Sequence, residues 1–481
     1  MITGEKPFIH MMKTPLCNYL YDVNTNMFAE LDEDTYQYLK EVEQSGNALE
    51  PVADARIKQN IDSLREQGFL SAKHPQEIRH SQSDMIAWHL DENINQMALQ
   101  VTQQCNFRCA YCVYCAGDFE LQRNHSSKRM SIETALAAVD FFAARCGNQD
   151  QPAIAFYGGE PLLEFPLIQK VVTYAEEKLY GKKLVFSITT NASLLTPEIA
   201  RFFSEHNFLT TISLDGTSET HDRSRRFAAT GQGSFAVILK NLKVAKEECP
   251  DFKFSFNIVV DPRYPSDSLH QLFNQEEFFP EAHVMPNLID DRFSIEKTVP
   301  SEVFLQQRNC HTFKGYLAYR GAYDRSKVSR LTNITLSDNF RRLQVRMKPA
   351  MLLPDVAAPG GPCIAGERRL FVSADGNLYP CERVSETSEV MNIGNLWDGF
   401  DLKKVDRILN IAQTTSEDCK KCWAFRHCML CSRNSDNCGE LSADLRRSQC
   451  SIVRAQVEGT FRDYLWMREF GISFAAILEG V

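Results

Sequence analysis

The sequence predicts an α/β protein built around an open, partial (β/α)6 barrel, and three observations support this fold class. Between about residues 96 and 290, short apolar segments alternate with helical segments, a pattern typical of βαβ units and a parallel sheet. Six such strand segments occur, which are too few to close an eight-stranded barrel. The chain of 481 residues is also long enough for about three domains, so smaller domains should flank the barrel.

The strands of this sheet are expected at six apolar segments, namely residues 97–102, 153–157, 184–189, 210–214, 252–260 and 283–285. Helical patterns between them cover residues 132–145, 166–179, 196–205 and 235–247. The barrel domain should therefore occupy residues 95–300. Residues 301–360 show an irregular helical pattern and are expected to bridge to a C-terminal domain at 361–481. In that domain, short elements, turn residues and cysteines replace the long periodic segments.

Residues 1–75 are expected to form a small, winged-helix-like α/β module. Two strand-like segments within residues 6–23 precede a helix that begins after Asp32, a residue suited to cap a helix. A second helix, at 53–67, carries apolar residues at helical spacing. An edge strand beside a helix can bind an extended peptide as an added strand. Residues 76–94 are polar and aperiodic and are expected as a linker.

Composition and charge exclude several classes of protein. Asp and Glu (62) outnumber Lys and Arg (53), which gives a formal net charge of -9. The chain therefore lacks the excess of basic residues that is typical of a nucleic-acid-binding protein. No apolar run reaches the roughly 18 residues of a membrane span, and the N-terminus lacks the apolar core of a signal peptide. We therefore expect a cytoplasmic protein with no membrane or nucleic-acid partner. In a reducing compartment, its 16 cysteines indicate metal ligands or catalytic thiols.

The first cysteine motif directly follows the first expected barrel strand. The sequence CNFRCAYC places Cys105, Cys109 and Cys112 at C-x3-C-x2-C spacing. Three thiolates on one loop can bind three irons of a [4Fe–4S] cluster and leave the fourth iron open for a small ligand. The position at the carboxyl end of a barrel strand favours an active site. A three-cysteine zinc site is the alternative, and Cys115, just beyond the motif, is expected to be an unligated thiol.

With this motif the sequence resembles the radical S-adenosylmethionine (SAM) superfamily, and further motifs follow the next expected strands. YGGEPLL follows the second strand, SITTNASLL ends the third, and SLDG with HDRSR follows the fourth. The resemblance implies a SAM site formed by Tyr111, Gly158, Gly159, Glu160, Asn191, Ser213 and Arg225. In such a site Glu160 faces the amino group, Arg225 the carboxylate and Tyr111 the adenine. A polar strand end with a surface arginine is the alternative for the side chains beyond the glycines.

The C-terminal cysteines form a second constellation. A hairpin turn at Asp375-Gly376 is expected to bring Cys363 and Cys381 together. Taken alone, the C-x2-C pairs that follow favour zinc sites. The whole pattern instead resembles the SPASM extension of radical SAM peptide-modifying enzymes, although its last internal spacing is C-x2-C rather than C-x3-C.

The SPASM resemblance implies two auxiliary [4Fe–4S] clusters. The outer cluster would be held by Cys419, Cys422, Cys428 and Cys450. The inner cluster would be held by Cys363, Cys381 and Cys431. Cys438 is extra to the seven-cysteine pattern and is either a fourth ligand of the inner cluster or a spectator. Glu382, beside Cys381, is a candidate general base for a substrate thiol.

Over its whole length the chain resembles maturases of ribosomally made peptides. Within that group it is similar to thioether-forming ranthipeptide maturases of the freyrasin type. The resemblance implies a radical SAM oxidoreductase whose cofactors are SAM and three [4Fe–4S] clusters. Its partners would be a precursor peptide, whose leader binds residues 1–75 and whose core contains cysteine, and an electron donor of the flavodoxin or ferredoxin type.

In the implied reaction, a 5′-deoxyadenosyl radical abstracts hydrogen from an acceptor residue, and a cysteine sulfur bonds to that carbon. Three alternatives stay open. The enzyme could be a sactipeptide synthase that joins sulfur to an α-carbon, or an anaerobic sulfatase-type maturase that oxidises Cys or Ser. A zinc-stabilised binding protein without a redox role is the third alternative.

Overall fold

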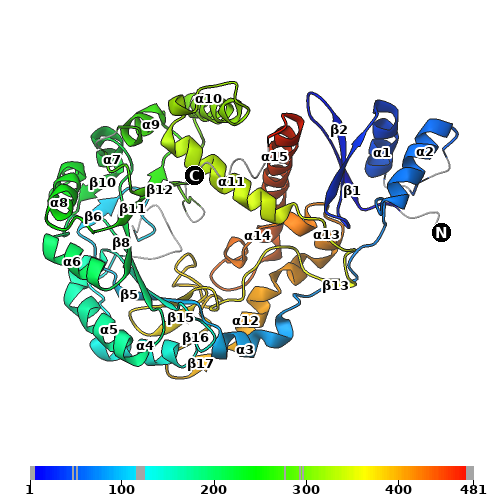
Figure 1. The fold of residues 1–481 in the computed structure, drawn as a ribbon. Coiled ribbons are helices and arrows are strands. Elements are labelled where there is room, and N and C mark those ends of the chain that lie inside the picture. The colour runs from blue at the N-terminus through cyan, green and yellow to red at the C-terminus, as the bar shows by residue number, and fades with distance from the viewer. Residues whose placement is uncertain are drawn as a thin grey trace.

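The computed structural model describes residues 6–45, 48–49, 52–114, 125–275, 278–291, 294 and 297–472. An open barrel with helices along its outer side lies opposite the N-terminal module, and C-terminal elements lie between them (Figure 1). Helix α11 (Arg330–Arg346) runs from the barrel side toward the C-terminal helix α15 (Cys450–Glu469). Among the described residues, no helix is long and apolar enough to cross a membrane.

Six parallel strands form the barrel sheet, in the order β12, β11, β9, β8, β7 and β5. Their bounds are β5 Gln96–Thr102, β7 Ala153–Gly158, β8 Val185–Thr190, β9 Phe208–Ser213, β11 Phe254–Val260 and β12 His283–Leu288. Each strand overlaps a segment expected to be a strand, so the predicted parallel sheet is confirmed. Strand β12 forms one edge, and the barrel is open as predicted.

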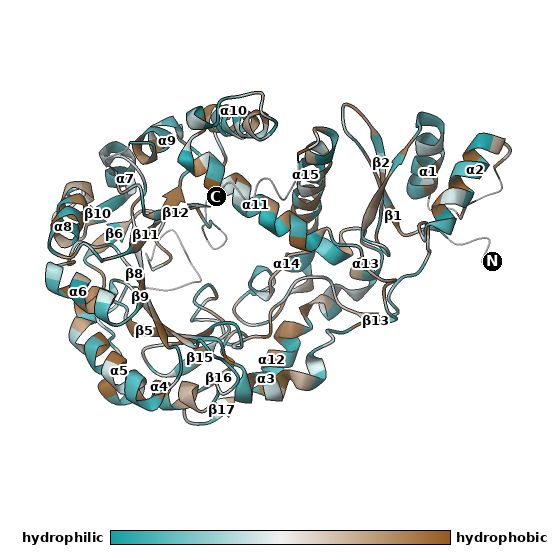
Figure 2. Ribbon diagram, in the orientation of Figure 1, coloured by the Kyte–Doolittle hydropathy of each residue, from teal (hydrophilic) through white to brown (hydrophobic). Residues whose placement is uncertain are grey.

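Helices connect these strands and cover the outer face of the sheet (Figure 1). They are α4 Ile132–Ala143, α5 Phe165–Lys178, α6 Pro197–Glu205, α7 Ser218–Ser224, α8 Phe235–Glu248 and α9 Asp267–Phe273. Ser131 caps α4 by accepting a hydrogen bond from the backbone N–H of Thr134, and Thr196 caps α6 in the same way. The strands are mainly apolar and the outer helices carry polar residues (Figure 2).

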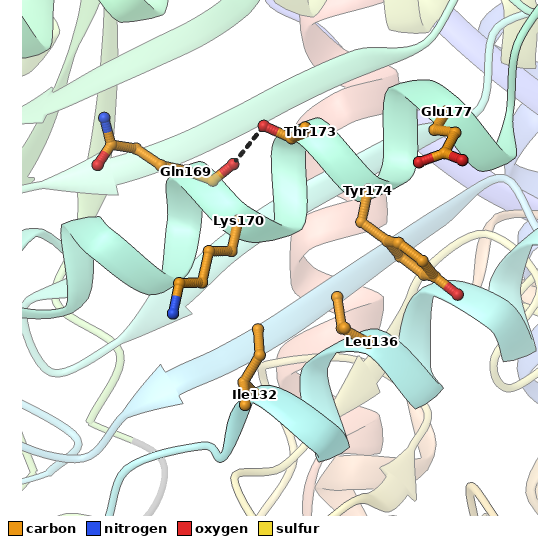
Figure 3. A pocket seen from close by; sticks show the side chains of 7 residues that line it. All are labelled: Ile132, Leu136, Gln169, Lys170, Thr173, Tyr174 and Glu177. Carbon is orange, nitrogen blue, oxygen red and sulfur yellow. Dashed lines mark hydrogen bonds between the residues drawn. The ribbon is translucent and has the colours of Figure 1, made fainter.

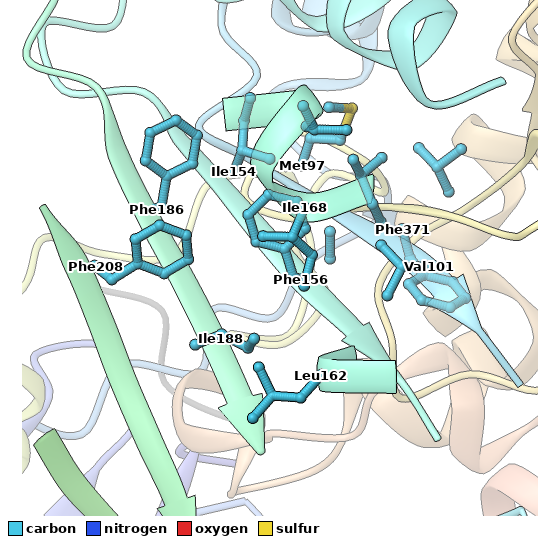
Figure 4. Close-up of a cluster of buried hydrophobic side chains, with 14 of the residues drawn as sticks. Met97, Val101, Ile154, Phe156, Leu162, Ile168, Phe186, Ile188, Phe208 and Phe371 are labelled. Atoms are coloured by element: carbon cyan, nitrogen blue, oxygen red, sulfur yellow. The ribbon is translucent and has the colours of Figure 1, made fainter. Parts of the chain in front are cut away.

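The core between sheet and helices follows from the alternation of side chains along each strand. On β5, Leu99 and Val101 are fully buried in the apolar cluster, whereas Gln100 between them points to the opposite face. Figure 4 shows part of this cluster, including Ile154, Phe156, Phe186 and Phe208 from neighbouring strands. Burying side chains of this size stabilises the fold by about 1.5–3 kcal/mol each. The packed sheet therefore fixes where the carboxyl ends of the strands lie.

The C-terminal region continues the barrel sheet. Strand β14 (Leu370–Val372) pairs parallel with β5, and β15 (Asn377–Tyr379) pairs antiparallel with β14. The short strands β16 (Gly394–Asn395) and β17 (Gly399–Phe400) complete the sheet on that side. The predicted hairpin turn before β15 is confirmed, and its Gly376 has a φ of +81°, a conformation that favours glycine.

Two long helices occupy the bridging region, which the sequence had indicated as irregular. They are α10 (Glu302–Tyr319) and α11, and each begins after a serine cap, Ser301 and Ser329. Helix α10 buries few of its side chains, so its apolar periodicity is weak. The remaining C-terminal helices are α12 Leu402–Leu409, α13 Ser416–Lys420, α14 Ala443–Ser448 and α15.

Residues 76–94 differ from the linker that we expected. Strand β4 (Glu77–Ile78) pairs with β13 (Val356–Ala357), and helix α3 (Ile86–Glu92) follows. Helix α3 buries Ile86 and Leu90 in the barrel core and lies beside α12 (Figure 1). This apolar pattern spans only two helical turns, which is too short to stand out among polar neighbours.

The N-terminal module has three strands where the sequence indicated two. Strands β1 (Ile9–Lys13), β2 (Asn18–Asp22) and β3 (Met27–Leu31) form an antiparallel sheet with β2 in the centre. Helices α1 (Glu33–Ser45) and α2 (Ala55–Glu66) follow. Strand β3 was missed because it is an edge strand with only partly buried side chains, so it lacks a clear apolar run.

This small sheet packs on both of its faces. Helices α1 and α2 pack against one face of the sheet. Helix α15 packs against the other face, and the rings of Tyr21 on β2 and Phe461 on α15 lie 4.5 Å apart. His10 stacks on Trp423 with ring centres 3.8 Å apart. Arg426 donates hydrogen bonds to two backbone carbonyls in the turn between β2 and β3. The module therefore shares a core with the C-terminal cysteine region.

Candidate functional site

The residues implied in SAM binding lie at the carboxyl ends of four neighbouring strands. The first cysteine motif follows β5, Gly158–Glu160 end β7, Asn191 follows β8, and Ser213 ends β9. In the sheet these strands stand side by side in the order β9, β8, β7, β5. Residues up to about 110 positions apart in sequence therefore meet at one edge, where active sites of such barrels form.

The first cysteine loop is clamped by a short antiparallel ribbon. Strand β6 (Phe107–Cys109) pairs with β10 (Arg225–Phe227), so that Arg225 stands opposite Cys109. The ribbon is extended at both ends by backbone hydrogen bonds of 3.0 and 2.8 Å. The last residue of the HDRSR motif, Arg225, therefore pairs with the cysteine loop. Arg225 is buried and is not a surface residue.

The two glycines of YGGEPLL allow the cysteine loop to pack on β7. A Cβ atom on Gly158 would collide with the carbonyl oxygen of Thr102, and one on Gly159 with that of Gln104. The backbone N–H groups of Gly159 and Glu160 donate to these two carbonyls at 3.0 and 2.8 Å. We expected the glycines to admit a ligand. In the structure, the absence of a side chain at both positions lets the backbone of the cysteine loop pack closely against them, and this contact also requires glycine.

Glu160 is a buried carboxylate that joins two strand ends. Only 1% of its surface is exposed, and it accepts hydrogen bonds from the Thr190 hydroxyl at 2.6 Å and the Asn191 backbone N–H at 2.8 Å. A third comes from the backbone of Leu162 at 3.0 Å. The Asn191 side chain in turn donates to Asn106 in the cysteine loop. A carboxylate offers about four acceptor positions, so Glu160 can accept one further donor.

Asp215 is a functional residue that the sequence reasoning missed. Its carboxylate accepts hydrogen bonds from the Tyr111 hydroxyl and, at 2.7 Å, from Nε of Arg225. Its other oxygen accepts the backbone N–H of Val259 on β11 at 2.9 Å. Nη1 of Arg225 lies 4.0 Å from the sulfur of Cys109. The signal was present, because Asp215 is the acidic residue of SLDG, two positions after Ser213.

Burial explains the ionisation of groups around Asp215. Burial raises the pKa of Tyr111 well above its usual value, so its hydroxyl stays protonated and donates. Burial, with the charge of Arg225, lowers the pKa of His221 to about 4. Nδ1 of His221 accepts the backbone N–H of Asp215 at 3.1 Å, and Nε2 pairs with Ser234. His221 is therefore neutral at pH 7 with its proton on Nε2.

Of the three cysteines in the first motif, Cys109 is buried and Cys105 and Cys112 are partly buried. Burial raises the pKa of Cys105 and of Cys109 to about 12, and the neighbouring thiols of the motif add to the rise. Without metal these groups are therefore protonated at pH 7, whereas a bound metal deprotonates a thiol outright. Cys115 lies outside the described residues.

The C-terminal cysteines gather in two further sets. Burial raises the pKa of Cys381 to about 12, and the charges of Cys431 and Cys363 contribute. A separate set joins Cys419, Cys422, Cys428 and Cys450, whose charges influence one another in a connected series. The SPASM resemblance assigns these cysteines to an inner and an outer cluster, and that assignment stays a prediction.

Cys438 has its own surroundings. Its sulfur lies 3.9 Å from the Ser385 hydroxyl and 3.8 Å from that of Thr387. Its φ of +73° is unusual for a residue with a side chain, and its backbone N–H is fixed by Asp436. Cys438 therefore contacts the loop that follows Cys381.

The outer set surrounds an arginine with an unmet donor. Arg446 is 1% exposed, and within the described residues its Nη1 has no hydrogen-bond partner. Nε donates to the Thr415 hydroxyl at 3.1 Å, and that hydroxyl lies 3.3 Å from the sulfur of Cys419. A buried cation with a spare donor, joined to Cys419 through Thr415, fits an anionic iron–sulfur cluster.

Single metal ions fit these sets less well. In the part of the chain that the structure describes, no three His, Cys, Asp or Glu side chains converge on a position for one metal ion. A [4Fe–4S] cluster places each thiolate on a different iron and so holds its ligands farther apart than one ion does.

Two carboxylates lie near the inner set. Glu382, the candidate base, is mostly buried and paired with Arg369, with Arg383 at 3.8 Å. Glu386, which sequence reasoning missed, accepts hydrogen bonds from Gln100 at 2.6 Å and Gln103 at 3.2 Å. Glu386 thus links the loop after Cys381 to the start of the first cysteine loop. Nothing in the local sequence marks it, because its partners lie far away along the chain.

A surface groove of about 420 Å³ lies away from these cysteines, between α4 and α5 (Figure 3). It is lined by Ile132, Leu136, Gln169, Lys170, Thr173, Tyr174 and Glu177. None of these side chains belongs to the strand ends or to a cysteine set. The groove is therefore separate from the candidate site.

Part of the chain, including the first cysteine motif, matches a known protein family. Residues 99–275 match the Radical SAM superfamily model. The matched segment contains the first cysteine motif and the strand-end residues described above, and proteins of that superfamily use SAM and a [4Fe–4S] cluster.

The chain is similar in sequence to two curated proteins. The chain is 25% identical over 237 residues to the radical SAM cyclopropyl synthase TigE of Paramaledivibacter caminithermalis, with 45% of this chain and 49% of that protein covered. It is 28% identical over 197 residues to a cysteine-type anaerobic sulfatase-maturating enzyme of Clostridium novyi, with coverage of 39% and 50%. The matches thus span about half the length of each relative.

One solved structure shares most of the fold. The structure of native anSMEcpe with bound AdoMet superposes with a TM-score of 0.55 at 20% identity, covering 78% of this chain and 97% of that chain. At this identity the likeness concerns the fold alone. It extends beyond the barrel strands, since they and their helices end before residue 290.

Proposed function

We propose that the protein is a radical SAM oxidoreductase that forms thioether cross-links in a ribosomally made precursor peptide. The observation that carries this proposal is the gathering of the motif cysteines into three separate sets, at the strand ends, beside β15 and at the start of α15. Three sets are suited to one SAM-binding cluster and two auxiliary clusters. A single radical SAM cluster would need only the first set.

The chain's own residues have defined tasks in this proposal. When bound, SAM and the first cluster supply a 5′-deoxyadenosyl radical that takes hydrogen from a carbon of the acceptor residue. Glu160 would accept a hydrogen bond from the amino group of SAM through its remaining acceptor position, and Arg225, whose Nε is held by Asp215, would pair with the carboxylate. Tyr111 and Asp215 keep Arg225 in place. The barrel excludes water from the reacting atoms.

Bond formation between the peptide sulfur and that carbon requires removal of the thiol proton and of one electron. Glu382 is the proposed proton acceptor, because it is the carboxylate next to Cys381. A flavodoxin- or ferredoxin-type partner exchanges the electrons with the protein. Two hydrogens leave the peptide for each bridge that forms.

The N-terminal module is the proposed site for the leader of the peptide. Strand β3 is an edge of its sheet, and an edge strand can pair with an extended peptide. A peptide substrate agrees with a solved structure of similar fold, in which anSMEcpe was determined with bound AdoMet and the Kp18Cys peptide.

A sulfatase-type maturase is the second candidate function. It is favoured by the 28% identity to a cysteine-type anaerobic sulfatase-maturating enzyme. Such an enzyme and a thioether-forming one use the same cofactors and differ in the fate of the peptide cysteine. The product therefore discriminates between them.

Co-expression with a cysteine-containing precursor peptide, followed by mass spectrometry, tests the proposal. A thioether product loses two hydrogens per bridge, resists thiol alkylation and gives fragments that stay linked. A product in which cysteine has lost its sulfur supports the sulfatase-type function. Cleavage of SAM with no change in any cysteine peptide overturns both.

Two cysteine variants test the inner set. If Cys363, Cys381 and Cys431 were the only protein ligands of an inner cluster, one iron would lack a protein ligand and could accept the peptide thiol. Cys438→Ala should then keep its iron and most cross-linking, whereas Cys431→Ala should lose cross-linking but still cleave SAM. Loss of an auxiliary cluster in Cys438→Ala would mean that the protein closes this site.

A further inference from the structure

The outer cysteine set has a built-in cation that no motif describes. Arg446 lies on the short helix α14, and its side chain is fixed at one end by the Thr415 hydroxyl, 3.1 Å from Nε. The other end, Nη1, is buried and has no hydrogen-bond partner in the described chain. Leaving a charged donor buried and unsatisfied costs free energy, so such an atom indicates a missing acceptor.

The surroundings of Arg446 identify the acceptor by its chemistry. The backbone carbonyl of Arg446 lies 3.6 Å from the sulfur of Cys450, and its Thr415 partner contacts Cys419. Arg446 is thus next to two of the four outer cysteines, to Cys450 through its own backbone and to Cys419 through Thr415. An acceptor among these sulfurs is either a thiolate or a sulfide of the cluster they bind.

We propose that Arg446 donates a hydrogen bond to the outer iron–sulfur cluster and raises its reduction potential. The inference rests on the proposed auxiliary clusters and adds a residue that tunes one of them. Four thiolates make such a cluster anionic, and its reduction adds a further negative charge. A buried cation with a directed donor stabilises the reduced state more than the oxidised state.

The neighbouring cations show why Arg446 has this role. Arg447, on the same helix, is half exposed and pairs with Asp418 and Asp444, which neutralise it. Arg454, on α15, also acts on Cys422 and Cys450, but its side chain is exposed to solvent, which screens its charge. Arg446 alone combines burial with an unused donor in the described part of this region.

Arg446→Met, with Arg446→Lys and Arg447→Met as partners, tests the proposal. Each full-length variant is reconstituted without oxygen in a background with Cys105, Cys109 and Cys112 changed to Ala, so that only the auxiliary clusters remain. Iron content and an electron paramagnetic resonance redox titration are then measured. We expect Arg446→Met to keep its iron and to move one of the two potentials to a more negative value. Arg446→Lys should move it less, and Arg447→Met should move neither.

The outcomes separate this inference from the proposed function. If the reference protein binds only about four irons, one auxiliary cluster is absent and the proposed function fails first. If it binds about eight irons and Arg446→Met has the same two reduction potentials as the reference protein, the inference about Arg446 is wrong. The proposal of two auxiliary clusters is then still supported. Loss of iron in Arg446→Met with retention in Arg446→Lys supports a required cation. Loss in both variants overturns the inference, because shape rather than charge is then needed.

Discussion

The first cysteine set and the outer set differ in how the charge of the neighbouring arginine is balanced. At the first site the cation beside the sulfurs, Arg225, is paired with Asp215 at 2.7 Å. At the outer site the cation, Arg446, has no carboxylate partner among the described residues. The first site has three cysteines on one loop at the strand ends, whereas the outer site takes four from separate elements.

This difference fits two different tasks. In the proposed function, a carboxylate that offsets the charge of Arg225 would favour a low potential at the SAM-binding cluster. An unpaired cation at Arg446 would favour a higher potential at an auxiliary cluster that passes electrons on. Three ligands leave an open position and four close it, by the logic that separates catalytic from structural metal sites.

The largest effect should come from removing each set of cysteines in turn. Changing Cys105, Cys109 and Cys112 to Ala should abolish SAM cleavage and remove about a third of the iron, because the proposed function gives this site one of three clusters. Changing Cys419 and Cys422 to Ala should remove a similar share of iron while SAM cleavage persists. Iron analysis and detection of 5′-deoxyadenosine measure both. Loss of SAM cleavage in both variants would show that the two sites are not separable.

Deleting residues 1–75 should affect the outer site and spare the first. The module packs on the outer cysteine region through His10, stacked on Trp423, and through Arg426, whereas the first site lies on the barrel. We expect the truncated protein to bind the leader peptide far more weakly, to lose the outer cluster and to cleave SAM without peptide. Binding assays and iron analysis measure this. A truncated protein with about 12 irons would show that the shared core is dispensable for the outer cluster.

Breaking the ion pair at the first site should destabilise the barrel. Asp215→Asn leaves Arg225 buried without a counter-charge, which costs about 3–5 kcal/mol of folding free energy. The exposed pair of Arg223 and Glu219 offers a control, and Glu219→Gln should cost less than about 1 kcal/mol. Anaerobic thermal unfolding compares them. Equal stability of the two variants would mean that Arg225 does not need Asp215.

A smaller effect should appear in acid. His221 binds a proton with a pKa of about 4 when folded, against about 6.5 when unfolded, so the unfolded chain takes up more protons as pH falls through this window. The contribution of His221 is present above pH 6.5 and is lost toward pH 4. It amounts to about 3 kcal/mol.

His221→Gln, which cannot take up this proton, should therefore lose stability less steeply than the wild type between pH 6.5 and 4.5. His206→Gln, on a partly exposed histidine that pairs with Glu176, serves as the control. Parallel stability curves for His221→Gln and the wild type would contradict the assignment of His221 as a buried neutral residue.

Sequence patterns predicted the parts of the molecule that have strong periodicity or fixed spacing. The buried strand β5 and the motif after it were both apparent, because apolar runs and cysteine spacing are local signals. Strand β3 and helix α3 were not, since a partly exposed edge strand and a two-turn helix carry little periodicity. Asp215, Glu386 and Arg446 were missed because their importance lies in partners that are distant along the chain.

The pairing of β14 with β5 has a consequence for any attempt to produce the barrel alone. Strand β5 occupies an interior position only because residues from beyond position 360 lie against it. A protein that ended after the barrel helices would expose the backbone of β5, next to the first cysteine loop. Bare strand edges recruit other chains, so the shortened protein should aggregate even though each of its own strands is intact.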